Sequence, residues 1–175
     1  MTIAIYPGSF DPIHNGHIEI VRRASLLFEQ VIWAAYDRPL KSLLFSEQER
    51  LEFMHEAAKD LPNVHVRSYH GLTVLFARQV GAKAIVRGLR ATHDFEIEYQ
   101  MALTNAQQAS DIDTVCLMTG AQYAFLSSSI LKEVALANGN ITTMVPPYVA
   151  DKLKTRLAQL GEDRGDKVKL VSLQE

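Results

Sequence analysis

The stretch TIAIYPGSFDPIHNGH, residues 2–17, sets the pattern from which the fold is predicted. Residues 2–6 are an apolar run that ends at Pro7-Gly8, which is typical of a buried strand. From residue 16 to residue 30 the apolar side chains recur at helical spacing. A strand, a short loop and a helix in this order indicate the opening unit of an α/β protein.

The same alternation continues along the chain. Further strands are expected at residues 31–36, 64–69, 84–86 and 114–118. Further helices are expected at residues 46–58, 72–80, 94–108, 128–138 and 147–160, with Gly81 and Gly139 as stops. Because crossover helices cover both faces of a parallel sheet, we predict a doubly wound α/β fold with five parallel strands. Residues 1–160 are expected to form one domain, and residues 161–175 a mobile tail. In an alternative interpretation, residues 168–173 of this tail add an edge strand to the sheet.

Composition limits the classes of function. The chain has 175 residues and a net charge of −2, which argues against a protein that coats nucleic acid or an anionic membrane. No signal peptide or membrane-spanning segment is expected. The single cysteine, Cys116, excludes an intramolecular disulfide and favours a cytoplasmic location. It lies in the last predicted strand, where we expect it to be buried in the core.

The loop after the first strand carries His14 and His17 as an H-x-G-H motif at a predicted helix start. Exposed backbone N–H groups and the helix dipole favour phosphate there, and an imidazole can donate to a phosphoryl oxygen. Two other interpretations remain: the histidines ligate zinc, or they only cap the helix. The zinc interpretation lacks a third ligand in the motif.

Three further segments follow predicted strands, at the edge where α/β proteins bind ligands. Arg87-Gly88-Leu89-Arg90 presents two guanidinium groups that suit phosphate oxygens, although such a pair is often only a solvated loop. The serines at 127–129 lie at the start of a predicted helix, where they either cap the helix or donate hydrogen bonds to an anion. Lys41 adds a cation, and Glu98 is either an exposed carboxylate or an acceptor for a ribose or adenine.

Together these motifs resemble the nucleotidylyltransferases that carry H-x-G-H or T-x-G-H, and within them the bacterial phosphopantetheine adenylyltransferases. The resemblance rests on GSFDPIHNGH, Lys41, VRGLR, Asp94-Phe95-Glu96 and FLSSS, and it covers the chain from about residue 3 to residue 160. It implies a Rossmann-like nucleotidylyltransferase fold. It also implies transfer of AMP from ATP to phosphopantetheine, with Mg²⁺ carried by the ATP phosphates and no protein metal ligand. The expected product is dephospho-coenzyme A, with pyrophosphate released.

The resemblance also implies roles for individual residues. The expected catalytic residues are His17, which stabilises the transition state, Lys41 and Arg90. The expected acceptor-binding residues are Ser9, Lys41, Thr73 and Arg87. The expected ATP-binding residues are Ser9, Phe10, His17, Gly88, Leu89, Arg90, Glu98, Tyr123, Ala124, Phe125, Leu126, Ser127, Ser128 and Ser129. A homohexamer and inhibition by product or coenzyme A are further expectations.

The sequence departs from the family pattern at His14, where threonine is usual, at Arg38 and at Ala106. Two rival functions stay open. One is a nucleotidylyltransferase that uses nicotinate mononucleotide, glycerol phosphate or CTP, and the other is a catalytically silent nucleotide-binding module. Under the favoured reading, Lys41, Arg87 and Arg90 meet at one sheet edge and form a small cationic pocket inside a nearly neutral protein.

Overall fold

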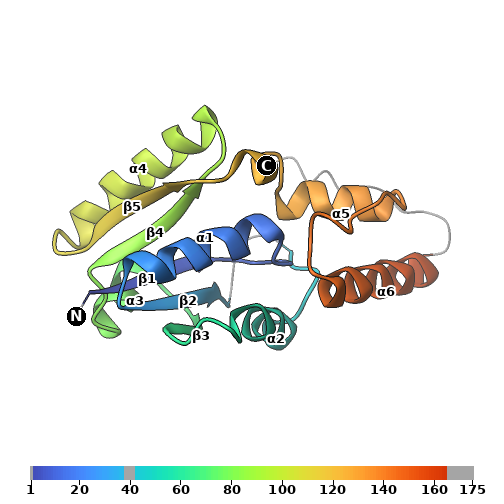
Figure 1. Cartoon of the computed structure of the whole chain (residues 1–175), viewed down its shortest axis with the longest axis horizontal. Coiled ribbons are helices and arrows are strands. Elements are labelled where there is room, and N and C mark those ends of the chain that lie inside the picture. The colour runs from blue at the N-terminus through green and yellow to red at the C-terminus, as the bar shows by residue number, and fades with distance from the viewer. Residues whose placement is uncertain (1, 38–41, 165–175) are drawn as a thin grey trace.

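The computed structural model describes residues 2–37 and 42–164, and its centre is a five-stranded parallel sheet. The strands follow one another in space as β3-β2-β1-β4-β5 (Figure 1). Their bounds are β1 Ile3–Gly8, β2 Gln30–Tyr36, β3 Val64–Tyr69, β4 Ala84–Leu89 and β5 Asp113–Met118. The chain winds outward from β1 in one direction and then from β4 in the other. The switch in strand order therefore lies between β1 and β4, the position at which such sheets bind ligands.

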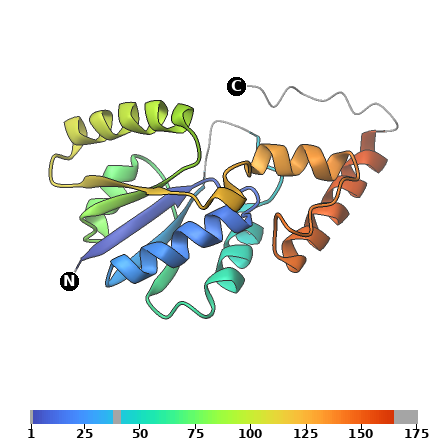
Figure 2. The same ribbon diagram turned by 45° about the horizontal axis from the view of Figure 1, so that its top comes forward.

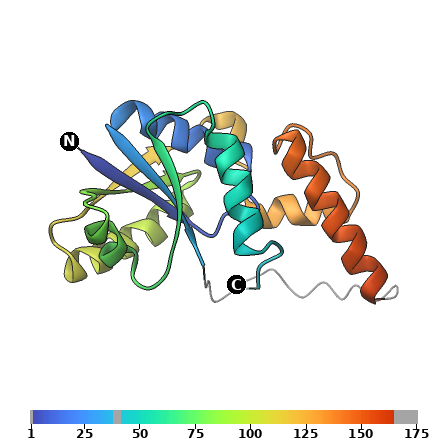
Figure 3. The same cartoon turned by 90° about the horizontal axis from the view of Figure 1, so that it is seen from below.

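Helices cover both faces of the sheet, as a doubly wound fold requires (Figures 1 and 3). They are α1 Asn15–Leu27, α2 Glu47–Ala58, α3 Thr73–Gln79, α4 Thr92–Gln108, α5 Ser128–Leu136 and α6 Pro147–Arg164, with a 3₁₀ turn at Ala121–Tyr123. Helices α1 and α2 lie on one face, and α3 and α4 lie on the other. Helices α5 and α6 extend beyond the carboxyl ends of the strands (Figure 2). The predicted fold class is confirmed.

Alternate strand residues build two separate cores. Ala4 and Tyr6 of β1 point toward α1 and α2, in a cluster that continues through Leu131 of α5 and Leu153 of α6. Ile5, between them, belongs to the smaller cluster under α3. A strand buried on both faces is expected for a central parallel strand. The larger core fixes α5 to the sheet, and so fixes the serines at its start beside the end of β1.

The structure corrects three predictions. Cys116 is exposed, because β5 is an edge strand and is not covered on both faces. The backbone at the end of α5 takes its left-handed conformation at Asn138, with φ 58°, and not at Gly139. Helix α6 continues to Arg164, past its own predicted end at residue 160. The alternative strand at 168–173 lies outside the described residues.

Two further predicted boundaries can be compared with the structure. Gly81 does adopt a positive φ, 74°, directly after α3. Strand β4 runs three residues further than expected, to Leu89, so Arg87 and Gly88 belong to the strand itself. No helix among the described residues is both long and apolar enough to cross a bilayer.

Candidate active site

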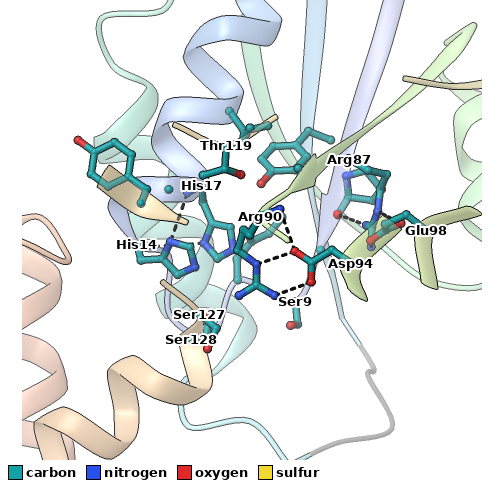
Figure 4. Close-up of a pocket in the computed structure, with 18 of the residues that line it drawn as sticks. Ser9, His14, His17, Arg87, Arg90, Asp94, Glu98, Thr119, Ser127 and Ser128 are labelled. Atoms are coloured by element: carbon teal, nitrogen blue, oxygen red, sulfur yellow. Dashed lines mark hydrogen bonds and ion pairs between the residues drawn. The ribbon is translucent and has the colours of Figure 1, made fainter. Parts of the chain in front are cut away.

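A cavity of about 340 Å³ opens where β1 and β4 end, at the switch point of the sheet (Figure 4). The turn after β1, the start of α1, the end of β4, helix α4 and the start of α5 all contribute to its wall. The lining residues are Tyr6, Pro7, Gly8, Ser9, Phe10, His14, Gly16, His17, Ile20, Arg87, Gly88, Arg90, Asp94, Glu98, Thr119, Tyr123, Ser127, Ser128 and Ser129.

The turn after β1 is held in a strained but well-packed conformation. Phe10 has φ 50°, a left-handed value that costs a non-glycine residue about 1–2 kcal/mol. Its ring is buried and packs edge-on against Tyr6, Trp33 and His17, at centroid distances of 5.3, 5.6 and 5.1 Å. A Cβ at Gly8 would lie 2.8 Å from Cζ of that ring, so only glycine fits there. Packing therefore offsets the backbone strain and fixes Ser9 at the cavity wall.

His14 and His17 cap helix α1 reciprocally, so capping is one role of the motif. The His17 backbone N–H donates to Nδ1 of His14 at 3.3 Å, and the His14 backbone N–H donates to Nδ1 of His17 at 3.2 Å. With both Nδ1 atoms acting as acceptors, each ring carries its proton on Nε2. The rings stack with centroids 3.6 Å apart. Capping and a role at the cavity are thus compatible, because the cap engages Nδ1 of His17 and places the proton of the ring on Nε2.

His14 is held neutral. Its side chain is buried, and burial followed by the positive charge of Arg90 lowers the pKa of His14 from 6.5 to about 3. A buried imidazole without a carboxylate partner loses the hydration of its charged form, which is the ordinary reason for such a shift.

The two arginines at the end of β4 are each paired with a carboxylate from α4. Arg87 donates from Nε and Nη2 to the two oxygens of Glu98, both at 2.6 Å, and from Nη1 to the Pro7 carbonyl at 2.9 Å. Arg90 donates from Nε and Nη2 to Asp94, both at 3.0 Å, and from Nη1 to the Leu126 carbonyl at 2.7 Å. Asp94 and Glu98 lie four residues apart, on one side of the helix.

This pairing bears on the two arginines of the expected cationic pocket, whereas Lys41 lies outside the described residues. Over the described residues, the charges of Arg87 and Arg90 are balanced by those of Glu98 and Asp94, and His14 is neutral. Burial works against the charge on Arg87, but the hydrogen bonds and charge of Glu98 outweigh it and raise the arginine pKa. Burial likewise opposes ionisation of Asp94, and Arg90 nevertheless lowers its pKa.

The serines at the start of α5 divide their work. Ser127 is the N-cap, and its Oγ accepts the backbone N–H of Ile130 at 3.1 Å. Ser128 donates to the Pro12 carbonyl at 2.9 Å and so ties α5 to the loop after β1. One serine thus serves as the expected cap, and all three line the cavity.

Most, but not all, of the predicted residues meet at this cavity. Eleven of them line it: Ser9, Phe10, His17, Arg87, Gly88, Arg90, Glu98, Tyr123, Ser127, Ser128 and Ser129. Five are not among the lining residues: Thr73, Leu89, Ala124, Phe125 and Leu126. Thr73 lies on α3, where its Oγ1 is 3.1 Å from the Tyr69 hydroxyl, and Leu126 is buried. Lys41 and Arg38 lie outside the described residues.

Sequence reasoning missed several residues that shape the site. Tyr6 lines the cavity, and burial raises the pKa of its hydroxyl, so it is a neutral phenol at physiological pH. Asp11 is buried and accepts the backbone N–H groups of Leu44 and Phe45, both at 2.9 Å, and the ammonium of Lys132 at 3.0 Å. Arg50 is fully buried on α2. The sequence did carry a signal for Arg50, because this charged residue falls on the face of α2 that the apolar pattern predicts to be buried.

Metal ligation by the protein has little support in the described part of the chain. Residues 2–37 and 42–164 contain no cluster of three or more histidine, cysteine, aspartate or glutamate side chains suited to a metal. Both Nδ1 atoms of the H-x-G-H motif are used in capping, which argues against the zinc interpretation. The two carboxylates at the cavity are already engaged by arginines.

Comparisons with known proteins place the chain among nucleotidyltransferases. Residues 5–134 match the cytidylyltransferase-like family. A phosphopantetheine adenylyltransferase from Desulforudis audaxviator is 49% identical over 162 residues, covering 93% of this chain and 99% of that protein. One from Roseiflexus castenholzii is 51% identical, covering 88% and 96%. A solved structure assigned as a nicotinate-nucleotide adenylyltransferase from Vibrio parahaemolyticus shares the fold, with a TM-score of 0.65 at 18% identity over 87% of this chain and 99% of that one.

Proposed function

The chain belongs to the phosphopantetheine adenylyltransferases, within the cytidylyltransferase-like family, and on this basis we propose that its cavity transfers the adenylyl group of ATP to phosphopantetheine. The observation that carries the proposal is identity of about half of all residues over nearly the whole length of the relatives. An oxygen of the acceptor phosphate attacks the α-phosphorus of ATP. The bond from that phosphorus to the bridging oxygen breaks, and pyrophosphate leaves, while dephospho-coenzyme A forms.

The acceptor phosphate already carries a nucleophilic oxygen, so the enzyme needs no strong base. The main barrier is to bring two polyanions into line, which positioning and charge stabilisation can lower. A magnesium ion carried by the ATP phosphates would supply charge neutralisation for the departing pyrophosphate. The pairing of Asp94 and Glu98 with arginines supports an ion held by the phosphates and not by protein carboxylates.

His17 is assigned to stabilise the transition state. The His14 backbone N–H occupies Nδ1 of His17, which leaves the proton on Nε2. That N–H donates to an α-phosphoryl oxygen as negative charge shifts there. Because the cap also fixes the ring orientation, this donor needs little rearrangement when ATP arrives.

Arg87 and Arg90 bind phosphate without leaving their carboxylates. A guanidinium has five N–H bonds, and each of these two arginines uses three of them within the protein. Two N–H bonds on each arginine therefore remain for phosphate oxygens. We expect Lys41 and Thr73 to contact the acceptor, and the β4 end and the segment 123–129 to contact ATP, so that the two substrates meet beside His17.

A homohexamer is the proposed assembly. None of the α4 side chains whose exposure is described is buried. Large apolar side chains of α4 and β5 are about half exposed or more: Phe95, Ile97, Tyr99, Met101, Leu103 and Met118. A patch of this kind is typical of a subunit interface. A monomer or dimer by light scattering would contradict this part of the proposal.

The enzyme is proposed to act in the cytoplasm, without nucleic acid or membrane partners, and to be inhibited by its product or by coenzyme A. The near-neutral charge and the single cysteine support this setting. The test is pyrophosphate release from ATP with a panel of acceptors. Release is expected with phosphopantetheine, and added coenzyme A should slow it. Release only with nicotinate mononucleotide or glycerol phosphate, or nucleotide binding without release, would favour one of the rival functions.

A further inference from the structure

Arg50 is a buried charged residue whose surroundings do not explain its presence by stability alone. Its side chain is fully buried in the first turns of α2, where the positive end of the helix dipole disfavours a cation. Its Nε and Nη2 atoms are buried without hydrogen-bond partners. Among residues 2–37 and 42–164 it forms no ion pair. Burial lowers the pKa of its guanidinium, and the charges of Asp11, Glu47 and Asp37 only partly offset this shift. A buried arginine with these deficits calls for an explanation other than packing.

Arg50 makes hydrogen bonds that connect the end of β1 with the end of β2 beside the cavity. Its Nη1 donates to the Ser9 carbonyl at 2.6 Å and to the Tyr36 carbonyl at 2.9 Å. Ser9 follows β1, and Tyr36 is the last residue of β2. Ser9 lines the cavity, and its neighbour Phe10 has the left-handed backbone described above. One nitrogen thus ties the strained turn to the adjacent strand.

The Phe10 ring contacts the His17 ring, so a fixed position of Phe10 also limits the movement of the His17 imidazole. The two rings pack edge to face, with centroids 5.1 Å apart. We propose that Arg50 is a positioning residue that holds the Ser9–Phe10 turn, and through it the imidazole of His17, in the geometry that adenylyl transfer needs. The role in transfer rests on the proposed function, whereas the restraint on the turn does not.

The experiment compares R50M with the matched control R156M. Arg156 also contacts α2 and donates to a backbone carbonyl, that of Leu44, but it has no bond to the turn. R50M should lower kcat at least tenfold with a smaller change in KM for ATP, and should leave the urea midpoint equal or higher. R156M should lower the urea midpoint and leave kcat within twofold. R50K, which restores a donor, should recover most of the lost kcat.

Hydrogen exchange over residues 8–12 gives a second readout that does not depend on activity. R50M should exchange faster there than wild type, and R156M should not. Wild-type kcat in folded R50M, or unchanged exchange, would overturn the proposal. If R50M fails to fold, R50Q takes its place, and wild-type kcat together with wild-type exchange in folded R50Q would also overturn the proposal. No pyrophosphate release by the wild type, together with faster exchange in R50M, would reject the proposed function and leave the restraint standing.

Discussion

The ends of β1 and β4 face the same cavity but are built in opposite ways. The β1 end is uncharged at its surface and rigid: Phe10 is locked among aromatic rings, and His14 and His17 cap each other. The β4 end is charged, and its two arginines form ion pairs with carboxylates of α4, a largely exposed helix. The difference suggests a division of labour, in which the β1 end fixes the reacting group in place and the β4 end adapts its hydrogen bonds to the phosphates.

Removal of His17 should have the largest effect. Loss of a preorganised donor to a transition-state oxygen typically costs about 2.7–4 kcal/mol, so H17A should lower kcat at least roughly a hundredfold. Affinity for ATP, measured by calorimetry, should change little. Near-normal turnover would remove His17 from the mechanism and break the contrast between the two ends.

Glycine substitutions should separate the rigid end from the adaptable one. In G8A the new Cβ would lie 2.8 Å from the locked Phe10 ring, so the free energy of unfolding should fall by about 1–3 kcal/mol. In G88A the nearest atom is Cγ1 of Ile20 at 3.1 Å, a side chain that can shift. Urea titrations should therefore show a smaller loss for G88A. Equal losses would contradict the difference in rigidity.

Neutralising Glu98 tests the β4 end. E98Q keeps the shape of the side chain but loses the charge-assisted pair with Arg87, which is worth about 1.5–3 kcal/mol. We expect kcat/KM for phosphopantetheine to fall at least roughly tenfold, because Arg87 loses its ion-pair partner beside the cavity. D94N removes the charge that pairs with Arg90, and its kcat/KM for ATP gives the corresponding comparison on the ATP side. A gain in kcat/KM from E98Q would show that Glu98 only opposes substrate charge.

The pH dependence of stability should report on His14. Its folded pKa of about 3 lies below the ordinary value of 6.5, so the folded state binds fewer protons than the unfolded state between these values. Its contribution is complete above about pH 6.5 and declines as pH falls toward 3, with a slope of up to about 1.4 kcal/mol per pH unit. H14T, which can still cap the helix, should flatten this slope in urea titrations. An unchanged slope would contradict a buried, neutral His14.

The sequence predicted the sheet, the helices and most of the cavity because those features follow from local patterns. Alternating strands and helices determined the doubly wound fold, and residues after β1 and β4 had to meet at its switch point. Exposure of Cys116 was not predictable, since an edge strand and a central strand share one local pattern. The balanced charge of the pocket was missed for a different reason: pairing of Arg87 with Glu98 depends on how α4 lies against β4.

Stereochemistry at the α-phosphorus tests the central claim most directly. If the rigid end aligns the acceptor and the adaptable end holds the phosphates, transfer needs no covalent intermediate on the protein. Phosphopantetheine adenylylated from one diastereomer of an α-thio ATP analogue should then show inverted configuration at phosphorus. Retention would mean two successive displacements through an adenylylated side chain, and would contradict a cavity that works by positioning and charge alone.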